Sequence, residues 1–146
     1  MARRVFFSFK YEDVSRAMVV RNSWVTQGKE AAGFIDAADF EALKRRGDAA
    51  IQNWIDNQLK GTSVTVVLVG EETCGSRWVK YEIKKSEELG HGLLGIDVSK
   101  IKDLDGNTSE RCGKIPKGYK FYLWFNDDGY NNMGDWIEEA AKAAGK

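Results

Sequence analysis

The chain has 146 residues, of which 42% are hydrophobic and 30% charged, and this predicts one soluble globular domain over 1–146 with a full hydrophobic core. Lysine plus arginine and aspartate plus glutamate each total 22, so the chain offers no net positive charge for nucleic acid or an anionic membrane, and no apolar run approaches the roughly 20 residues of a membrane span. With two cysteines, one histidine and no signal-peptide pattern, we expect a cytoplasmic protein without a disulfide framework and without a histidine-rich metal site.

The first half of the chain alternates short apolar runs with amphipathic segments. The aromatic and branched run 4–9 predicts a buried strand, and a helix is predicted over 13–24. A very short strand is predicted at 33–36. The next helix carries apolar residues at three- and four-residue spacing over 51–59 and ends at Gly61.

The second half repeats the same alternation. The continuous branched run 63–69 is the clearest strand in the chain. A helix is predicted from Ser76 to Gly90, where serine is a favoured first residue and glycine a favoured stop. Strands are predicted at 93–98 and 120–124, and a final helix presents apolar residues between 133 and 144.

Strands that alternate with helices, each strand a nearly continuous apolar run, favour a parallel sheet with helices on both faces. We therefore predict an α/β fold: one flavodoxin-like, doubly wound parallel sheet of about five strands. Ligands of such sheets bind beyond the carboxyl ends of the strands, between the first and third strands in the commonest order. The polar segment 100–118 is long for a loop, and is either a lid or a mobile connection.

One acidic residue stands where an apolar residue is expected. Winding the helix 76–89 at about 100° per residue places Trp78, Val79 and Ile83 on one face, and Glu82 falls inside that face one turn after Trp78. A half-buried carboxylate loses solvation energy, so it requires a partner or a function. The structural alternatives are an exposed position at the edge of the face and a pairing with a buried arginine, lysine or tyrosine.

Three stretches of the chain together resemble the TIR domain. The segment 5–13 (VFFSFKYED) is similar to its first box, and 33–36 (GFID) is similar to its second strand and the start of the loop that follows. The segment 76–83, with the pattern SxWVxxEI, is similar to the motif that carries the catalytic glutamate in NAD-consuming members. The closer resemblance is to TIR-like proteins of bacterial Thoeris anti-phage systems, which share the RVFFSF opening and the RWVxYEI helix.

The chain also departs from the TIR pattern. Val79 replaces the usual cysteine, and the loop after Asp36 lacks the Pro-Gly turn of signalling-adaptor members. Glu71 and Glu72 precede the Glu82 helix and make that loop a poor place for phosphate. The position of a bound pyrophosphate is therefore left open.

The resemblance implies an enzyme that cleaves the nicotinamide–ribose bond of NAD, with Glu82 as the catalytic residue. Nicotinamide leaves as a neutral molecule, so no general acid is needed, and one carboxylate in a dry pocket can stabilise the cation-like ribose. NAD would be the substrate, with no further cofactor and no metal. Hydrolysis and cyclisation of the ADP-ribose both remain open, and the Thoeris resemblance implies a cyclic nucleotide read by a separate effector protein.

Five further residues are candidates for substrate binding, each with a structural alternative. Trp78 would wall the pocket or stack on a flat ring, unless it is a core residue. Ser8 would bond a ribose or phosphate, or else a local backbone group, and Phe9 would lie against a base, or in the core. Lys10 would contact phosphate, or only solvent. By resemblance, Asp36 would approach a ribose hydroxyl, or else cap the next turn.

A second class of function stays open from the sequence. TIR-like domains also act as non-catalytic interaction modules that assemble with other domains. TIR enzymes in turn often need self-association to complete the site, so self-association is expected under either reading.

Overall fold

A parallel sheet forms the centre of the computed structural model, which describes residues 4–26, 31–34 and 37–146. Its five strands are β1 (Val5–Ser8), β2 (Ala31–Ala32), β3 (Val64–Val69), β4 (Gly92–Asp97) and β5 (Lys120–Leu123), in the order β2-β1-β3-β4-β5. Every adjacent pair is parallel. This is the flavodoxin-like strand order, so the predicted fold class is confirmed.

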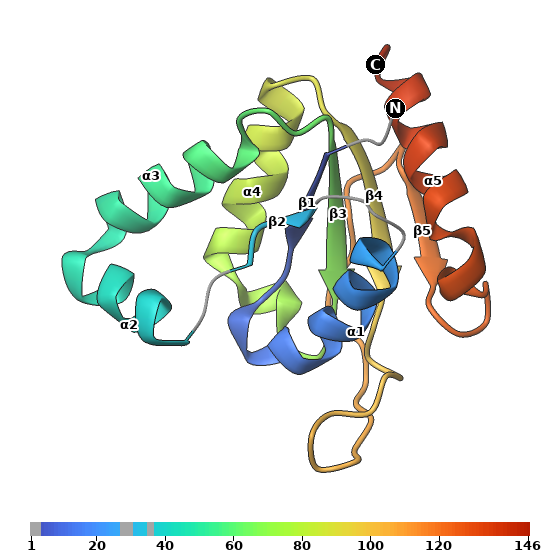
Figure 1. Cartoon of the computed structure of the whole chain (residues 1–146), viewed down its shortest axis with the longest axis horizontal. Coiled ribbons are helices and arrows are strands. Elements are labelled where there is room, and N and C mark those ends of the chain that lie inside the picture. The colour runs from blue at the N-terminus through green and yellow to red at the C-terminus, as the bar shows by residue number, and fades with distance from the viewer. Residues whose placement is uncertain (1–3, 27–30, 35–36) are drawn as a thin grey trace.

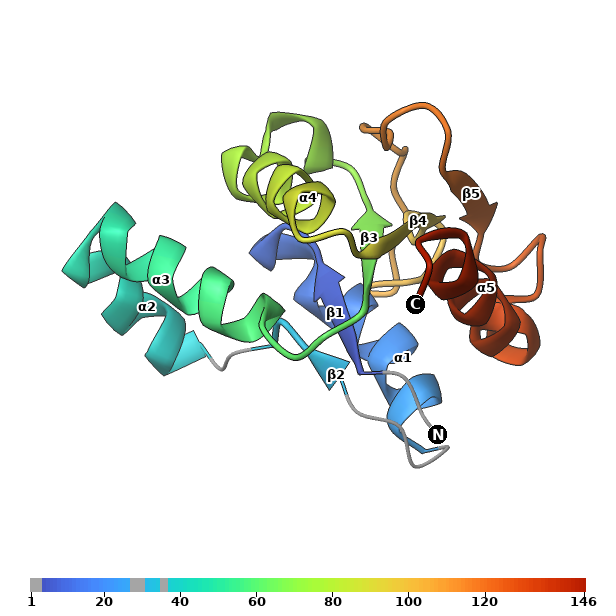
Figure 2. The same cartoon turned by 90° about the horizontal axis from the view of Figure 1, so that it is seen from above.

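Helices cover both faces of the sheet. They are α1 (Val14–Val25), α2 (Ala37–Arg46), α3 (Asp48–Leu59), α4 (Arg77–Glu88) and α5 (Gly129–Ala143), with short 3-10 turns η1 (Tyr11–Asp13) and η2 (Thr73–Gly75). Figure 2 shows α1 and α5 on one face and α3 and α4 on the other, with α2 lying against α3 away from the sheet. None of the described helices is long and apolar enough to cross a membrane.

The central strand β3 divides the core in two. Val66 and Leu68 pack in the cluster formed with α1 and α5, whereas Val67 and Val69 pack against Val79 of α4. Successive side chains of a strand point to opposite faces, so a run that is apolar throughout is needed where helices cover both faces.

The second strand and the following helix differ from the prediction. The strand was expected at 33–36 and is formed by Ala31 and Ala32 instead. Gly33 has a φ of +95°, and a side chain there would meet the carbonyl oxygen of Phe7, so the backbone leaves the sheet at this glycine. Helix α2 was not predicted, because half of its ten residues are charged and most of its apolar residues are alanines.

The segment 100–118 extends beyond the carboxyl ends of the strands as a loop (Figure 1). The buried Arg16 of α1 donates from Nε to the Ile101 carbonyl at 2.6 Å and from Nη2 to the Asn107 carbonyl at 2.9 Å. A hydrogen bond from the Cys112 amide to the Gly70 carbonyl, at 2.9 Å, fixes the part of the segment that returns toward the sheet. These hydrogen bonds join the segment to the body at Ile101, Asn107 and Cys112, and the expectation of a lid or a mobile connection stays a prediction.

The two cysteines also differ from the prediction. Cys74, in η2, and Cys112 form a disulfide with a Cα–Cα distance of 5.2 Å, and the Cys74 amide donates to the Cys112 carbonyl at 2.8 Å. The expectation that the chain has no disulfide framework was therefore wrong. The fold brings together two loops that are 38 residues apart in sequence, which the spacing of two cysteines does not reveal.

Candidate active site

Helix α4 places Glu82 beneath the carboxyl end of β1. The helix begins at Ser76, whose side-chain oxygen accepts a hydrogen bond from the Val79 amide at 3.2 Å, as expected for a serine N-cap. One turn of helix separates Trp78 from Glu82, and Glu82 is 6% exposed. The predicted place of this acid on the buried face of the helix is confirmed, and the alternative of an exposed edge position was wrong.

The carboxyl group of Glu82 is held by a neutral donor. The hydroxyl of Ser8, the last residue of β1 and fully buried, donates to Oε1 at 2.6 Å. Burial raises the pKa of Glu82 from 4.5 to about 8, and the Ser8 hydrogen bond acts in the opposite direction. Among the residues that the structure describes, no lysine or arginine forms an ion pair with Glu82. A purely structural ion pair therefore does not account for the burial of this carboxyl group.

Glu82 lies in the wall of a cavity of about 230 Å³. The cavity opens between η1, α2, α3 and α4, next to the carboxyl end of β1. Its lining is rich in aromatic side chains and consists of Phe7, Phe9, Lys10, Tyr11, Glu12, Gly33, Phe40, Leu43, Lys44, Ile51, Trp54, Ile55, Ser76, Trp78 and Glu82. An apolar pocket with a few polar groups is typical of a small-molecule site. Because Glu82 itself is buried, electrostatic interactions of its carboxyl group are stronger than they would be in water.

Most of the residues predicted to bind substrate meet at this cavity. Phe9, Lys10 and Trp78 line it together with Glu82. Ser8 does not belong to the lining and acts on the cavity through its hydrogen bond to Glu82. Asp36 lies outside the described residues.

Three of these residues, Lys10, Trp78 and Phe9, also have neighbours that restrict their side chains. Lys10 Nζ forms an ion pair with Glu72 Oε1 at 3.5 Å. The Arg77 guanidinium lies 4.5 Å from the centroid of a Trp78 ring, a cation–π geometry that restrains the indole at the cavity wall. Phe9 contacts Phe34 with ring centroids 5.0 Å apart and packs on the core. The alternative that Phe9 is a core residue is therefore confirmed, although Phe9 also lines the cavity.

The sequence did not reveal several residues of the cavity. Tyr11 and Phe40 stack with ring centroids 4.3 Å apart, and Lys44 follows one turn after Phe40 on α2. These α2 residues were missed because the helix itself was not predicted. Trp54 carried a signal in its apolar spacing, but the same spacing is typical of a core residue.

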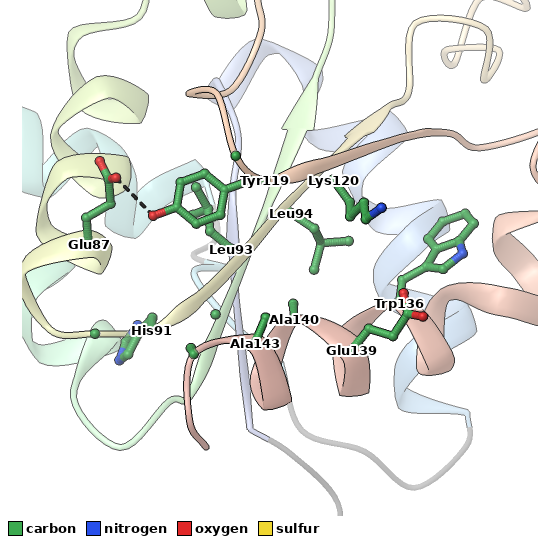
Figure 3. A pocket seen from close by; sticks show the side chains of 14 residues that line it. Glu87, His91, Leu93, Leu94, Tyr119, Lys120, Trp136, Glu139, Ala140 and Ala143 are labelled. Atoms are coloured by element: carbon green, nitrogen blue, oxygen red, sulfur yellow. Dashed lines mark hydrogen bonds between the residues drawn. The ribbon is translucent and has the colours of Figure 1, made fainter.

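A second and larger hollow, of about 600 Å³, lies at the opposite end of the sheet (Figure 3). It is lined by the first residues of β4 and β5 and by the last turns of α5. Tyr119 donates from its hydroxyl to Glu87 at 3.0 Å, so this carboxylate has a partner. Because ligands of doubly wound sheets bind at the carboxyl ends of the strands, the smaller cavity around Glu82 is the better candidate.

Comparison with known proteins agrees with this choice of site. Residues 6–103 match the family described as Thoeris protein ThsB, TIR-like domain. The chain belongs to this family. The matched segment contains β1 from Phe6 onward, β2 to β4 and every residue that lines the Glu82 cavity, so the TIR-like resemblance of the sequence is confirmed.

A curated ThsB relative comes from Bacillus cereus (strain MSX-D12). It is 43% identical over 139 residues, which cover 93% of this chain and 72% of the relative. That protein carries the provisional name cyclic ADP-D-ribose synthase ThsB1.

Proposed function

We propose that this ThsB family member cleaves the nicotinamide–ribose bond of NAD and closes the ADP-ribose into a cyclic nucleotide signal for anti-phage defence. The observation that carries the proposal is the buried carboxyl of Glu82 in an aromatic cavity, without a cationic partner among the described residues. The synthesis of cyclic ADP-D-ribose named for the 43% identical relative supports the same reaction.

In the proposed mechanism, Glu82 stabilises positive charge on the ribose. The bond between the anomeric carbon and the nicotinamide nitrogen breaks, and its electron pair leaves with the nicotinamide, which becomes neutral. The ionised Glu82 carboxylate faces the cation-like ribose in a site from which water is largely excluded. The pKa of Glu82 is raised in the empty protein, and the positively charged ring of bound NAD favours the ionised form.

The neighbouring residues position the substrate. We assign Trp78 and Phe9 to the walls against which flat rings pack, because both line the cavity with Glu82. Ser8 orients the carboxyl group through its 2.6 Å hydrogen bond. Lys10 is a candidate phosphate contact, and Asp36 is proposed, on the family resemblance, to approach a ribose hydroxyl.

The fate of the ADP-ribose depends on the group that reaches the anomeric carbon. A ring nitrogen or hydroxyl of the same molecule closes a cycle, and an attacking hydroxyl loses its proton in that step. Attack by water gives ADP-ribose and a proton. A cyclic product can act as a signal for a separate effector protein, which we propose as its receiver in the cytoplasm. Sites for drug-sized ligands typically occupy about 300–1,000 Å³, so a cavity of about 230 Å³ encloses only part of NAD. We therefore propose that self-association covers the rest.

The test is to incubate the purified protein with NAD over a range of protein concentrations. Nicotinamide is followed by chromatography and the second product by mass spectrometry. We expect nicotinamide release and a product lighter than ADP-ribose by one water. ADP-ribose alone would indicate hydrolysis instead of cyclisation. No nicotinamide at any protein concentration would favour a non-catalytic interaction module.

A further inference from the structure

Helix α2 brings a lysine to the cavity that no sequence motif indicated. Lys44 lines the cavity with Glu82, and its side chain is 49% exposed. Its Nζ lies 4.9 Å from the centroid of the Phe40 ring and 3.3 Å from Glu41 Oε1. Residues three and four apart on a helix are neighbours, so Phe40 and Glu41 together hold the ammonium group at the cavity.

The aromatic support of Lys44 is itself fixed. Phe40 stacks on Tyr11, with centroids 4.3 Å apart and an angle of 22° between the planes. Tyr11 belongs to η1, directly after β1, so the stack links α2 to the strand that carries Ser8. The cation is therefore oriented before a ligand arrives, which lowers the entropy lost on binding.

Lys10, the other lysine that lines the cavity, has two glutamates near it. Lys10 pairs with Glu72 at 3.5 Å, and Glu12 also lines the cavity. Burial is the main cause of the raised pKa of the nearby Asp13, and the negative charges of Glu72 and Glu12 raise that pKa further. The same two charges would repel an incoming phosphate. The carboxylate beside Lys44 is that of Glu41, whose side chain is 58% exposed, about the same as the 59% of Glu72. Lys44 differs from Lys10 in its second support, the Phe40 ring 4.9 Å from its Nζ.

We infer that Lys44 binds a phosphate of the substrate and so restricts this site to phosphorylated nicotinamide nucleotides. The inference rests on the proposed function for the nicotinamide part of the ligand. Glu82 acts on a bond that NAD and nicotinamide riboside share, so the carboxylate alone does not distinguish between them. A lysine that contacts only the phosphate supplies that difference.

The test measures equilibrium binding by calorimetry, with NAD and nicotinamide riboside as the two ligands. The parent protein carries Glu82→Gln so that neither ligand is consumed. Adding Lys44→Gln should weaken NAD binding about tenfold, as expected for loss of one charge-assisted contact, and leave riboside binding within about twofold. Adding Glu41→Gln should strengthen NAD binding, because it removes the competing acid.

Lys80→Gln, on α4 and outside the cavity lining, is the matched control and should change neither affinity. An equal loss for both ligands, no loss for NAD, or binding of neither ligand to the parent would overturn the inference. The proposed function is measured separately, by nicotinamide release from NAD with Glu82 intact. A protein that binds NAD through Lys44 but releases no nicotinamide would refute the proposed function and leave the inference standing.

Discussion

Ser8 and Glu82 are 74 residues apart in the chain and share a hydrogen bond of 2.6 Å. Ser8 ends β1, and Glu82 lies in the middle of α4, the helix that follows β3. The strands β1 and β3 are neighbours, with Ser8 opposite Val67. Helix α4, which connects β3 to β4, therefore lies close enough to the end of β1 for Glu82 to reach Ser8. The order of the strands thus brings the Ser8 hydroxyl to the buried Glu82 carboxyl group, for which it is the side-chain donor among the described residues.

Removing that donor should make the acid harder to ionise. In Ser8→Ala the carboxylate loses a hydrogen bond of its charged form, which is worth about 1.5–3 kcal/mol, so the pKa of Glu82 should rise by about one unit or more. We expect kcat/KM for NAD at pH 7 to fall about tenfold and to recover toward the wild-type value at higher pH.

Ser86→Ala is the matched control for this substitution. The Ser86 hydroxyl is equally buried and donates to the backbone carbonyl of Glu82 at 2.7 Å, not to its carboxylate. It should leave the midpoint of the pH profile in place. A Ser8→Ala profile identical to that of the wild type would show that the hydroxyl does not tune the acid.

The wild-type enzyme should be most active on the alkaline side. Burial raises the pKa of Glu82 to about 8, and the reaction needs the ionised form, so kcat/KM should rise with pH and level off above about 8. The midpoint of kcat should lie lower, because bound NAD places a positive charge beside the carboxylate. Initial rates of nicotinamide release, measured over a range of NAD concentrations from pH 5.5 to 9, give the pH profiles of both kcat/KM and kcat. A flat profile would exclude a titrating buried acid.

The same ionisation should make stability depend on pH. The pKa of Glu82 is higher in the folded protein than its ordinary value of 4.5, so the folded state binds more protons between about pH 4.5 and 8. The Glu82 contribution to the free energy of unfolding is therefore full below pH 4.5 and decreases by on the order of 5 kcal/mol as pH rises through 8. Urea titrations at pH 5 and pH 8 should show this decrease in the wild type and a smaller one in Glu82→Gln.

Strand β3 and helix α4 were predictable from the local sequence pattern. The apolar run 63–69 predicted β3, and the Ser76 cap with the amphipathic spacing after it predicted α4 and the buried place of Glu82. Both signals arise within one element, from side-chain periodicity and capping chemistry.

The parts that failed depend on contacts between elements. Helix α2 has little apolar face of its own, and its packing on α3 decides that it forms. The place of Lys44 in the cavity follows from that packing, and so had no local signal. The Cys74–Cys112 disulfide joins two loops whose approach depends on the whole sheet.

The disulfide should stabilise the protein without being needed for the chemistry. It closes a loop over a sequence separation of 38, for which restriction of the unfolded chain gives about 2–4 kcal/mol. Neither cysteine lines the Glu82 cavity. A phosphine reductant should lower the melting temperature, while nicotinamide release well below that temperature stays within about twofold.

A Cys74→Ser/Cys112→Ser variant provides the control for reduction. It should melt at the lower temperature with or without the reductant. An unchanged melting temperature on reduction of the wild type would mean that the disulfide does not contribute to stability. A rate that collapses while the protein is still folded would place the disulfide in the catalytic site instead.

The most direct measurement is nicotinamide release from NAD at pH 8 by the wild type, Glu82→Gln and Glu87→Gln. Glu87 is an exposed glutamate on the same helix and serves as the matched control. We predict release by the wild type and Glu87→Gln, and a rate at least about 1,000-fold lower for Glu82→Gln, with a melting temperature no lower than that of the wild type. A folded Glu82→Gln protein that releases nicotinamide at the wild-type rate would contradict the assignment of Glu82 as the catalytic residue.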